Sequence, residues 1–217
     1  DRGYRVSRSY QANASGEREP NDRPETATPL SLDTPVNGIF STGDDRDCYS
    51  FELASPTLLQ VQVSSQEEAP AAFELSIDND KAQPLWSGQL LKGEQADHSP
   101  SLALQAGRYT LALKHGRGKI ASYALLVKNL QGAVAPDNND VPETAAPLEP
   151  GIPMHASSLA LDEAPGSHYF TFRTDQPGGL SLSFANLNHA FLSPSYHMAL
   201  FDAATGNMIQ EGDMEGT

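Results

Sequence analysis

The stretch Leu59-Gln60-Val61-Gln62-Val63 alternates apolar and polar side chains, and Phe73-Glu74-Leu75-Ser76-Ile77 repeats the pattern. Successive side chains of a β-strand point to opposite faces, so each stretch predicts a strand with one dry and one wet face. Five further short segments, rich in β-branched and aromatic residues and bounded by Gly, Pro, Asp or Asn, are Val36–Phe40, Tyr49–Leu53, Leu102–Leu104, Tyr109–Leu113 and Tyr123–Val127. Seven such strands without long helical patterns predict an all-β fold of antiparallel sheets, a sandwich or jelly roll.

An internal repeat divides the chain into two copies. Residues Pro24–Leu30 (PETATPL) return as Pro142–Leu148 (PETAAPL), and Asn21-Asp22 returns as Asn139-Asp140, both at an offset of 118 residues. A repeat of this length indicates two copies of one domain. We therefore expect a leader or linker over 1–16, a first sandwich over 17–130, a linker over 131–138 and a second, degenerate sandwich over 139–217.

The second copy lacks counterparts of the last strands of the first. By the same offset, the hairpin Tyr109–Val127 would correspond to positions 227–245, which lie beyond Thr217. We expect either that the chain is part of a longer protein or that the second sandwich is shortened.

Charge and composition limit the function classes. The chain has 28 acidic and 14 basic residues, a formal net charge of −14, which repels nucleic acid and anionic lipid surfaces. No stretch approaches the roughly 18 apolar residues of a membrane helix, so we expect neither nucleic-acid binding nor membrane insertion. Cys48 is the single cysteine, which fits the cytosol or an exported bacterial protein without disulfides.

Two acidic runs are candidates for a cation site. In an extended segment Glu17, Glu19 and Asn21 share a face, with Asp22 at the next position, and Asp44 and Asp47 approach from the other side. Carboxylate, amide and carbonyl oxygens are the ligands of Ca²⁺, which takes roughly 6 to 8 of them. The alternative is that both runs are solvated acidic turns.

The order of several short motifs resembles the bacterial pre-peptidase C-terminal domain, here in tandem copies. The motifs are Glu17-Arg18-Glu19-Pro20-Asn21-Asp22, Ala27–Leu30, Gly38-Ile39, Asp47-Cys48-Tyr49-Ser50-Phe51 and Gly107-Arg108-Tyr109-Thr110-Leu111. The resemblance covers residues 17–128 closely and 135–217 more loosely. It implies a compact β-sandwich found beside secreted peptidases and in other exported bacterial proteins, with collagenase relatives that act as calcium-stabilised collagen-binding modules.

The resemblance also implies a ligand set for calcium in the first copy. Its members are Glu17, Glu19, Asn21, Asp22, Asp44 and Asp47, with a main-chain oxygen from Ile39. Lys114 and Gly116 stand where the collagen-binding relatives carry surface tyrosines, which argues against collagen binding.

The second copy differs at the candidate ligands. Ala135 and Asp137 stand in place of Glu17 and Glu19, and His168 stands in place of Asp47. We therefore predict that the first copy binds calcium and that the second binds it weakly or not at all.

No catalytic constellation stands out in the sequence. The six histidines lack the spacing of a zinc helix, and no Gly-x-Ser-x-Gly motif occurs. We expect a non-catalytic, periplasmic or secreted bacterial module that binds or spaces a protein or polysaccharide partner. The alternatives are accessory domains of a secreted hydrolase whose catalytic domain lies outside this chain, and a carbohydrate-binding module that uses Trp86, for which a packing role is the competing interpretation.

Overall fold

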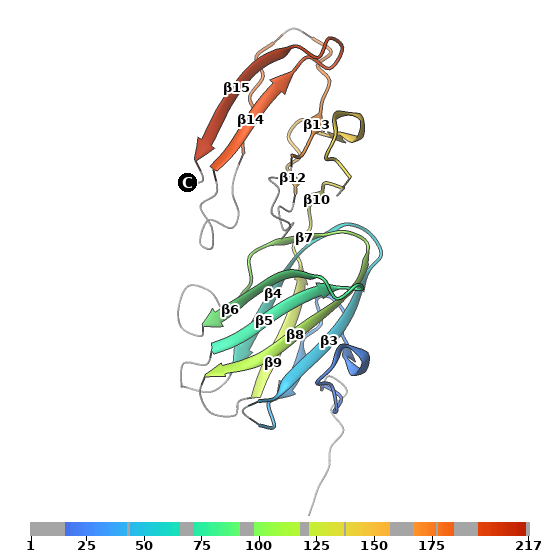
Figure 1. Ribbon diagram of the computed structural model, residues 1–217, viewed down its shortest axis with the longest axis vertical. Helices are drawn as coiled ribbons and strands as arrows, with labels where there is room; N and C mark the ends of the chain where they lie inside the picture. Colours follow the sequence, from blue (N-terminus) through green and yellow to red (C-terminus); the bar gives the residue numbers. More distant parts are fainter. Residues whose placement is uncertain are drawn as a thin grey trace, which may run out of the picture.

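A computed structural model of the chain describes residues 16–42, 44–65, 72–91, 98–117, 122–136, 138–156, 167–176, 178–184 and 195–215. Regular structure among these residues consists of β-strands and two one-turn 3₁₀ helices (Figure 1). The predicted all-β class is therefore confirmed. Within this part of the chain, no helix has the length and apolar character needed to cross a membrane.

The first copy is a sandwich of two sheets (Figure 1). One sheet has the order β1 (Thr28–Pro29), β3 (Arg46–Leu53), β8 (Gly107–Arg117), β5 (Ala72–Asn79) and β6 (Pro84–Leu91). The other has the order β2 (Val36–Ile39), β9 (Ser122–Asn129), β4 (Thr57–Ser65) and β7 (Leu102–Leu104). All pairings are antiparallel except that of β1 with β3.

The core lies between the two sheets and follows the alternation seen in the sequence. In β5, Phe73, Leu75 and Ile77 are buried, while the residues between them are not. β4 buries Leu59, Val61 and Val63 in the same way. Each fully buried side chain of this size contributes about 1.5–3 kcal/mol to folding. The two stretches that predict the fold thus form the facing layers of its core.

β6 is a strand that the sequence does not predict, because Pro84-Leu85-Trp86-Ser87-Gly88 has no clear alternation. It pairs with β5, with Trp86 opposite Ile77. Trp86 is partly buried and packs against the core, and a Cβ on Gly88 would lie 2.6 Å from its Cζ2 atom. This placement supports the packing role of Trp86 over the sugar-stacking role.

The second copy begins with the same elements as the first. Helix η2 (Pro142–Thr144) precedes β11 (Ala146–Pro147), as η1 (Pro24–Thr26) precedes β1. β11 pairs in parallel with β13 (Phe170–Thr171), as β1 pairs with β3. The internal repeat of the sequence is therefore also present in the structure.

Two further pairs of strands belong to the region after the first sandwich. β10 (Ala133–Val134) pairs in parallel with β12 (Met154–His155), so residues 131–138, predicted as a linker, include a short strand. β14 (Ser195–Phe201) and β15 (Met208–Glu215) form an antiparallel hairpin, which stands apart from the first sandwich (Figure 1).

Candidate metal centre

The segment that begins at Gly16 lies against the edge of the first sandwich. Gly16 forms a parallel bridge with Asn37 of β2. Three backbone N–H groups then fix the segment: Glu17 N donates to Asn37 O (3.0 Å), Arg18 N donates to Thr28 Oγ1 (3.0 Å), and Cys48 N donates to Asn21 O (2.8 Å). The acidic run therefore lies between β2 and β3, which places it beside Asp47.

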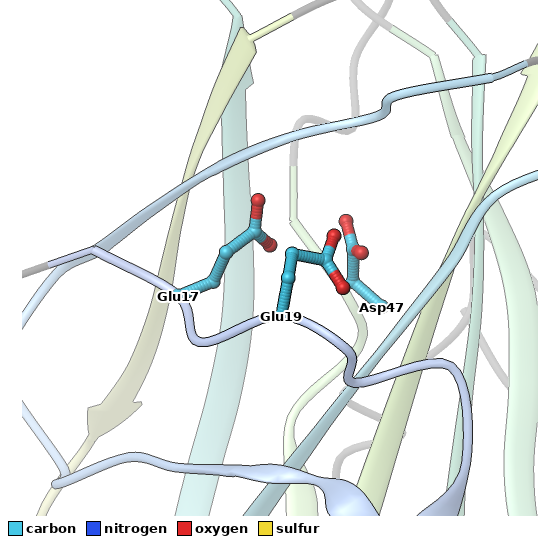
Figure 2. A group of neighbouring side chains, drawn as sticks. All are labelled: Glu17, Glu19 and Asp47. Atoms are coloured by element: carbon cyan, nitrogen blue, oxygen red, sulfur yellow. The ribbon is translucent and has the colours of Figure 1, made fainter.

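Three carboxylates converge at this position. Glu17 and Glu19 point from the segment toward Asp47 on β3 (Figure 2). One oxygen of each of the three lies within 4.8 Å of the others. Asp47 is fully buried, Glu17 is half-buried and Glu19 is exposed. The cluster is thus open on the side of Glu19 and closed on the side of the core.

Two buried tyrosines form the inner wall of the cluster. Tyr49 Oη donates to Glu17 Oε2 (3.0 Å), and Tyr123 Oη donates to Asp47 Oδ2. The two hydroxyls are also 2.6 Å apart. On the outer side, Ile39 N donates to Glu17 Oε1 (2.7 Å). The carboxylates of Glu17 and Asp47 are therefore held in fixed orientations.

Gly38 makes room for this arrangement. A Cβ at this position would lie 2.3 Å from Tyr123 Cζ and 2.7 Å from Glu17 Oε2. Both distances are too short for any side chain, so the close approach of β2 to Glu17 and Tyr123 requires glycine.

The side chain of Asn21 completes the cluster. It is fully buried, and one terminal atom of its amide lies 2.9 Å from Glu19 Oε2 and 3.2 Å from Asp47 Oδ1. Because nitrogen and oxygen of an amide are assigned from their contacts, two orientations exist. With nitrogen there, the amide donates to both carboxylates. With oxygen there, the amide oxygen faces the oxygens of Glu19 and Asp47, and its nitrogen donates to Glu17 Oε2 (3.5 Å). The second orientation suits a bound cation.

Burial shapes the ionisation of these groups. Burial, followed by the charges of Glu17, Asp45 and Glu19, raises the pKa of Asp47 to about 8, against the opposing hydrogen bond from Tyr123. Burial also raises the pKa of Glu19, although the backbone N–H of Asn21 acts in the other direction. The pKa values of Tyr49 and Tyr123 are raised as well, first by burial. Asp47 therefore retains its proton at neutral pH unless a cation compensates its charge.

The remaining predicted ligands lie differently. Asp22 is exposed at the surface. Asp44 is exposed in the turn before β3, and Ile39 faces Glu17 through its N–H group. The structure thus brings together Glu17, Glu19, Asn21 and Asp47 and leaves Asp22 and Asp44 at the surface.

Asp45 is a buried carboxylate near the cluster that the sequence does not single out. Its Oδ2 atom accepts hydrogen bonds from the N–H and the hydroxyl of Ser41, and its Oδ1 atom accepts one from Arg46 N. Although burial opposes ionisation, these hydrogen bonds lower its pKa. Asp45 is therefore negatively charged, and its charge helps to raise the pKa of Asp47.

Tyr49, Tyr123 and Gly38 are further residues of the candidate site, for which the sequence predicts no role there. Tyr49 is two residues after Asp47, so alternation in β3 could have placed it on the same inner face. Tyr123 is 76 residues from Asp47, and its contact arises from the pairing of β9 with β2, for which no local signal exists.

The corresponding position of the second copy has different chemistry. Tyr169 N donates to Asn139 O (2.7 Å), as Cys48 N does to Asn21 O. His168 takes the place of Asp47, and its Nδ1 atom lies 2.9 Å from Asn139 Oδ1. Ala135, in place of Glu17, is buried, while Asp137 lies outside the described residues. This position has lost two carboxylates and gained an imidazole.

The residues of the first copy fit a calcium ion. Two oxygens bound to one Ca²⁺ are at most about 5 Å apart, since each bond is about 2.3–2.6 Å long, and the carboxylate oxygens lie within 4.8 Å. All of these donors are oxygens, which suit a hard cation. Two ionised carboxylates 4 Å apart repel by about 4 kcal/mol at an effective dielectric constant of about 20, and a divalent cation removes that cost.

Comparisons with known proteins give similar structures but no family. No protein-family model matches the sequence, and no curated protein matches it. The chain is similar to the pre-peptidase C-terminal domain of a collagenase from Bacillus anthracis, with 24% identity and a TM-score of 0.40 over 50% of this chain and 100% of that one. The resemblance expected from the sequence is therefore also found among solved structures.

A second similar structure is PliG from Aeromonas hydrophila, a periplasmic inhibitor of g-type lysozyme. It shows 19% identity and a TM-score of 0.33 over 46% of this chain and 93% of that chain. PliG from Salmonella Typhimurium shows 18% identity and a TM-score of 0.29 over 46% of this chain and 96% of that one. At these values the likenesses assign neither a ligand nor a partner to this chain.

Proposed function

We propose that the first sandwich binds one Ca²⁺ ion through Glu17, Glu19, Asn21 and Asp47. The observation that supports this proposal is the convergence of three carboxylates and an amide on one point beside the fully buried Asp47. Among the described residues, the groups that hydrogen-bond these carboxylates are hydroxyls, an amide and backbone N–H groups, none of which is a cation.

The ion would fasten the leading segment to the sandwich. Glu17, Glu19 and Asn21 belong to that segment, whereas Asp47 belongs to β3. Without the ion, ionisation of Asp47 would add a buried charge beside Glu17 and Asp45. Binding therefore couples the docking of residues 16–22 to the stability of the first copy.

The setting in which such a site is useful is outside the cytosol. Extracellular calcium modules bind with dissociation constants of about 10⁻⁴–10⁻³ M, and an exposed ligand such as Glu19 suits this weaker class. We therefore assign the chain to a periplasmic or secreted bacterial protein. Its two copies serve as a non-catalytic binding or spacer module, alone or beside the catalytic domain of a secreted hydrolase.

A groove on the outer face of the first sheet is the candidate surface for a protein or polysaccharide partner. It has a volume of about 370 Å³, with a floor of small residues that include Ser76, Ser87 and Ala112. Arg46 and Lys114 stand opposite each other on β3 and β8 at its side. Glu74, which pairs with Lys114 across β5 and β8, also lines the groove. The lining therefore combines two cations with one carboxylate, in contrast to the acidic chain as a whole.

Calorimetric titration of the whole chain with Ca²⁺ tests the proposal. We expect one ion per chain, and a loss of at least about tenfold in affinity for Glu17→Gln and for Asp47→Asn, since each removes one of the charged ligands. Glu25→Gln, an equal change of charge at an exposed position of η1, should leave the affinity unchanged. Equal affinities for all four proteins would refute the site.

A further inference from the structure

Two rows of side chains cross the outer face of the first sheet and line its groove. The strand pairing across β3, β8, β5 and β6 gives the first row as Arg46, Lys114, Glu74 and Gln89. The second row lies two residues away on the same strands and holds Ala112, Ser76 and Ser87. Residues i and i+2 of a strand share a face, so long charged and polar side chains stand beside a floor of small ones in this groove.

The two cations of the groove lack an ion-pair partner in the described part of the chain. Arg46 and Lys114 are directly opposite each other, and like charges at such positions destabilise a sheet. Glu74 is opposite Lys114 on the other side, but none of the ion pairs between described residues includes Arg46 or Lys114. The Nε atom of Arg46 is buried without a hydrogen-bond partner among these residues. A bound anion would offset the repulsion between the two cations.

The groove presents side chains and not backbone groups to a ligand. β3, β8 and β5 each have a neighbouring strand on both sides, so their backbone N–H and C=O groups bond within the sheet. A peptide that binds by adding a strand needs a free edge, which these three strands do not offer. Recognition therefore depends on the hydroxyls of Ser76 and Ser87, the amide of Gln89 and the charged groups.

The mixed charges of the lining distinguish between two kinds of acidic partner. Arg46 and Lys114 suit a carboxylate, which the planar guanidinium can bind through two hydrogen bonds. Glu74 accepts hydrogen bonds but repels a second carboxylate nearby. An acidic saccharide carries hydroxyls beside its carboxylate, and these can donate to Glu74, whereas the side chains of an acidic peptide offer mainly carboxylates. The lining therefore favours the saccharide.

We propose that the groove binds a polysaccharide segment that contains a uronic acid, with the carboxylate of the sugar between Arg46 and Lys114 and its hydroxyls on Ser76, Ser87 and Glu74. This ligand class rests on the function proposed above, in which the chain is a binding module. The volume of about 370 Å³ falls within the range of about 300–1,000 Å³ for ligand sites. None of the described residues that line the groove is aromatic, so the affinity depends on charge and decreases with salt.

Calorimetric titration of the whole chain with an oligogalacturonate of about four sugars tests the ligand class. The titration is done in EDTA, so that calcium cannot bridge the acidic sugar to the protein, and at about pH 6, where Asp47 keeps its proton without calcium. We expect binding that weakens at least about tenfold between about 50 mM and 500 mM salt. The methyl ester of the same oligomer, which keeps the hydroxyls and loses the charge, should bind at least about tenfold more weakly. Equal binding of acid and ester, or no binding of the acid, would overturn the proposal.

Three substitutions of one positive charge each test the position of the ligand. Arg46→Gln and Lys114→Gln should each weaken binding of the oligogalacturonate about tenfold, since each removes a charge-assisted hydrogen bond. Arg108→Gln removes the same charge from the same face of β8 outside the groove, and the affinity should stay within about twofold. Lys114 is exposed, so its variant is informative even if Arg46→Gln does not fold. An equal loss in all three variants would indicate general attraction by charge and contradict the site.

A second ligand separates the saccharide from an acidic peptide. A glutamate peptide with the same number of carboxylates should bind at least about fivefold more weakly than the oligogalacturonate, because Glu74 repels its additional charges. Tighter binding of the peptide would identify a protein partner and contradict the proposal. The calcium titration described above reports separately on the metal centre. A chain that binds calcium but not the acidic sugar would refute the ligand class alone, and the reverse result would refute the metal site alone.

Discussion

Asp47 is the residue on which the charge balance of the cluster depends. It is fully buried, it accepts a hydrogen bond from Tyr123, and its neighbours include Glu17, Glu19 and Asp45. In the absence of a metal ion its pKa is raised to about 8. In the unfolded chain an aspartate titrates near pH 3.9.

The first prediction is that calcium-free protein loses stability as the pH rises. Because the folded pKa of Asp47 is about 8 and the unfolded one is about 3.9, the folded state holds an extra proton between these values. The contribution of Asp47 is fully present below about pH 4 and is lost as the pH rises through about 8. Denaturation at pH 5 and pH 8 should show this decline for the wild type, and a smaller one for Asp47→Asn.

Calcium opposes this loss of stability at higher pH, because the ion binds the ionised form of Asp47. Binding should release a proton at pH 7, and the affinity should increase toward pH 8. Identical pH profiles for the wild type and for Asp47→Asn, with or without calcium, would show that Asp47 is not the titrating group.

Gly38 provides a second test at the scale of one residue. In Gly38→Ala the new Cβ would collide with the ring of Tyr123 and with Glu17 Oε2. We expect a loss of stability of about 1–3 kcal/mol, as for other overpacked sites, together with weaker calcium binding because Glu17 is displaced. Gly178→Ala, where a Cβ meets no atom within 4 Å, is the control. A stable Gly38→Ala protein with unchanged affinity would contradict the described contact.

At the scale of elements, the carboxylates of the leading segment face Asp47 on β3. The segment contains Glu17, Glu19 and Asn21, and two backbone hydrogen bonds tie its ends to β2 and β3. Such a peripheral segment has few apolar contacts of its own, so its local opening costs less than global unfolding.

Limited proteolysis tests whether calcium holds this segment. Arg18 is exposed and lies between the two glutamates. Chelation should increase trypsin cleavage after Arg18, since opening of the segment becomes more frequent. Cleavage after Arg173, whose side chain is 91% exposed in the second copy, should not change. If chelation increased cleavage equally after Arg18 and Arg173, its effect would be on the protease and not on the leading segment.

Strands whose two faces differ in polarity could be predicted from the sequence, whereas β6 could not. β4 and β5 alternate residue by residue, so one face is buried and the pattern is unambiguous. β6 lies at the edge of its sheet with Trp86 and Gly88 in contact, a local arrangement without periodicity. Alternation predicts which residues share a face, and not which strands become neighbours.

The same limit applies to the candidate metal centre. The i, i+2 spacing of Glu17, Glu19 and Asn21 predicts their convergence, and they do converge with Asp47. The sequence does not distinguish Asp44 from Asp45, because the turn before β3 decides which of them is buried. Whether the converging groups bind calcium stays a prediction.

At the scale of the whole molecule, the two copies begin with the same elements and differ in the side chains at the candidate metal centre. Both begin with a 3₁₀ turn and a short parallel pairing. The first copy encloses a full core and three clustered carboxylates, whereas the second replaces Asp47 with His168. We therefore expect calcium to stabilise the first copy and to leave the second unaffected.

A crystal structure grown in excess calcium, with anomalous scattering measured, tests the central claim most directly. We predict one anomalous peak per chain, with oxygens of Glu17, Glu19, Asn21 and Asp47 about 2.3–2.6 Å away and the amide oxygen of Asn21 turned inward. A structure with no peak there, in which the nitrogen of Asn21 donates to Glu19 and Asp47, would contradict the account.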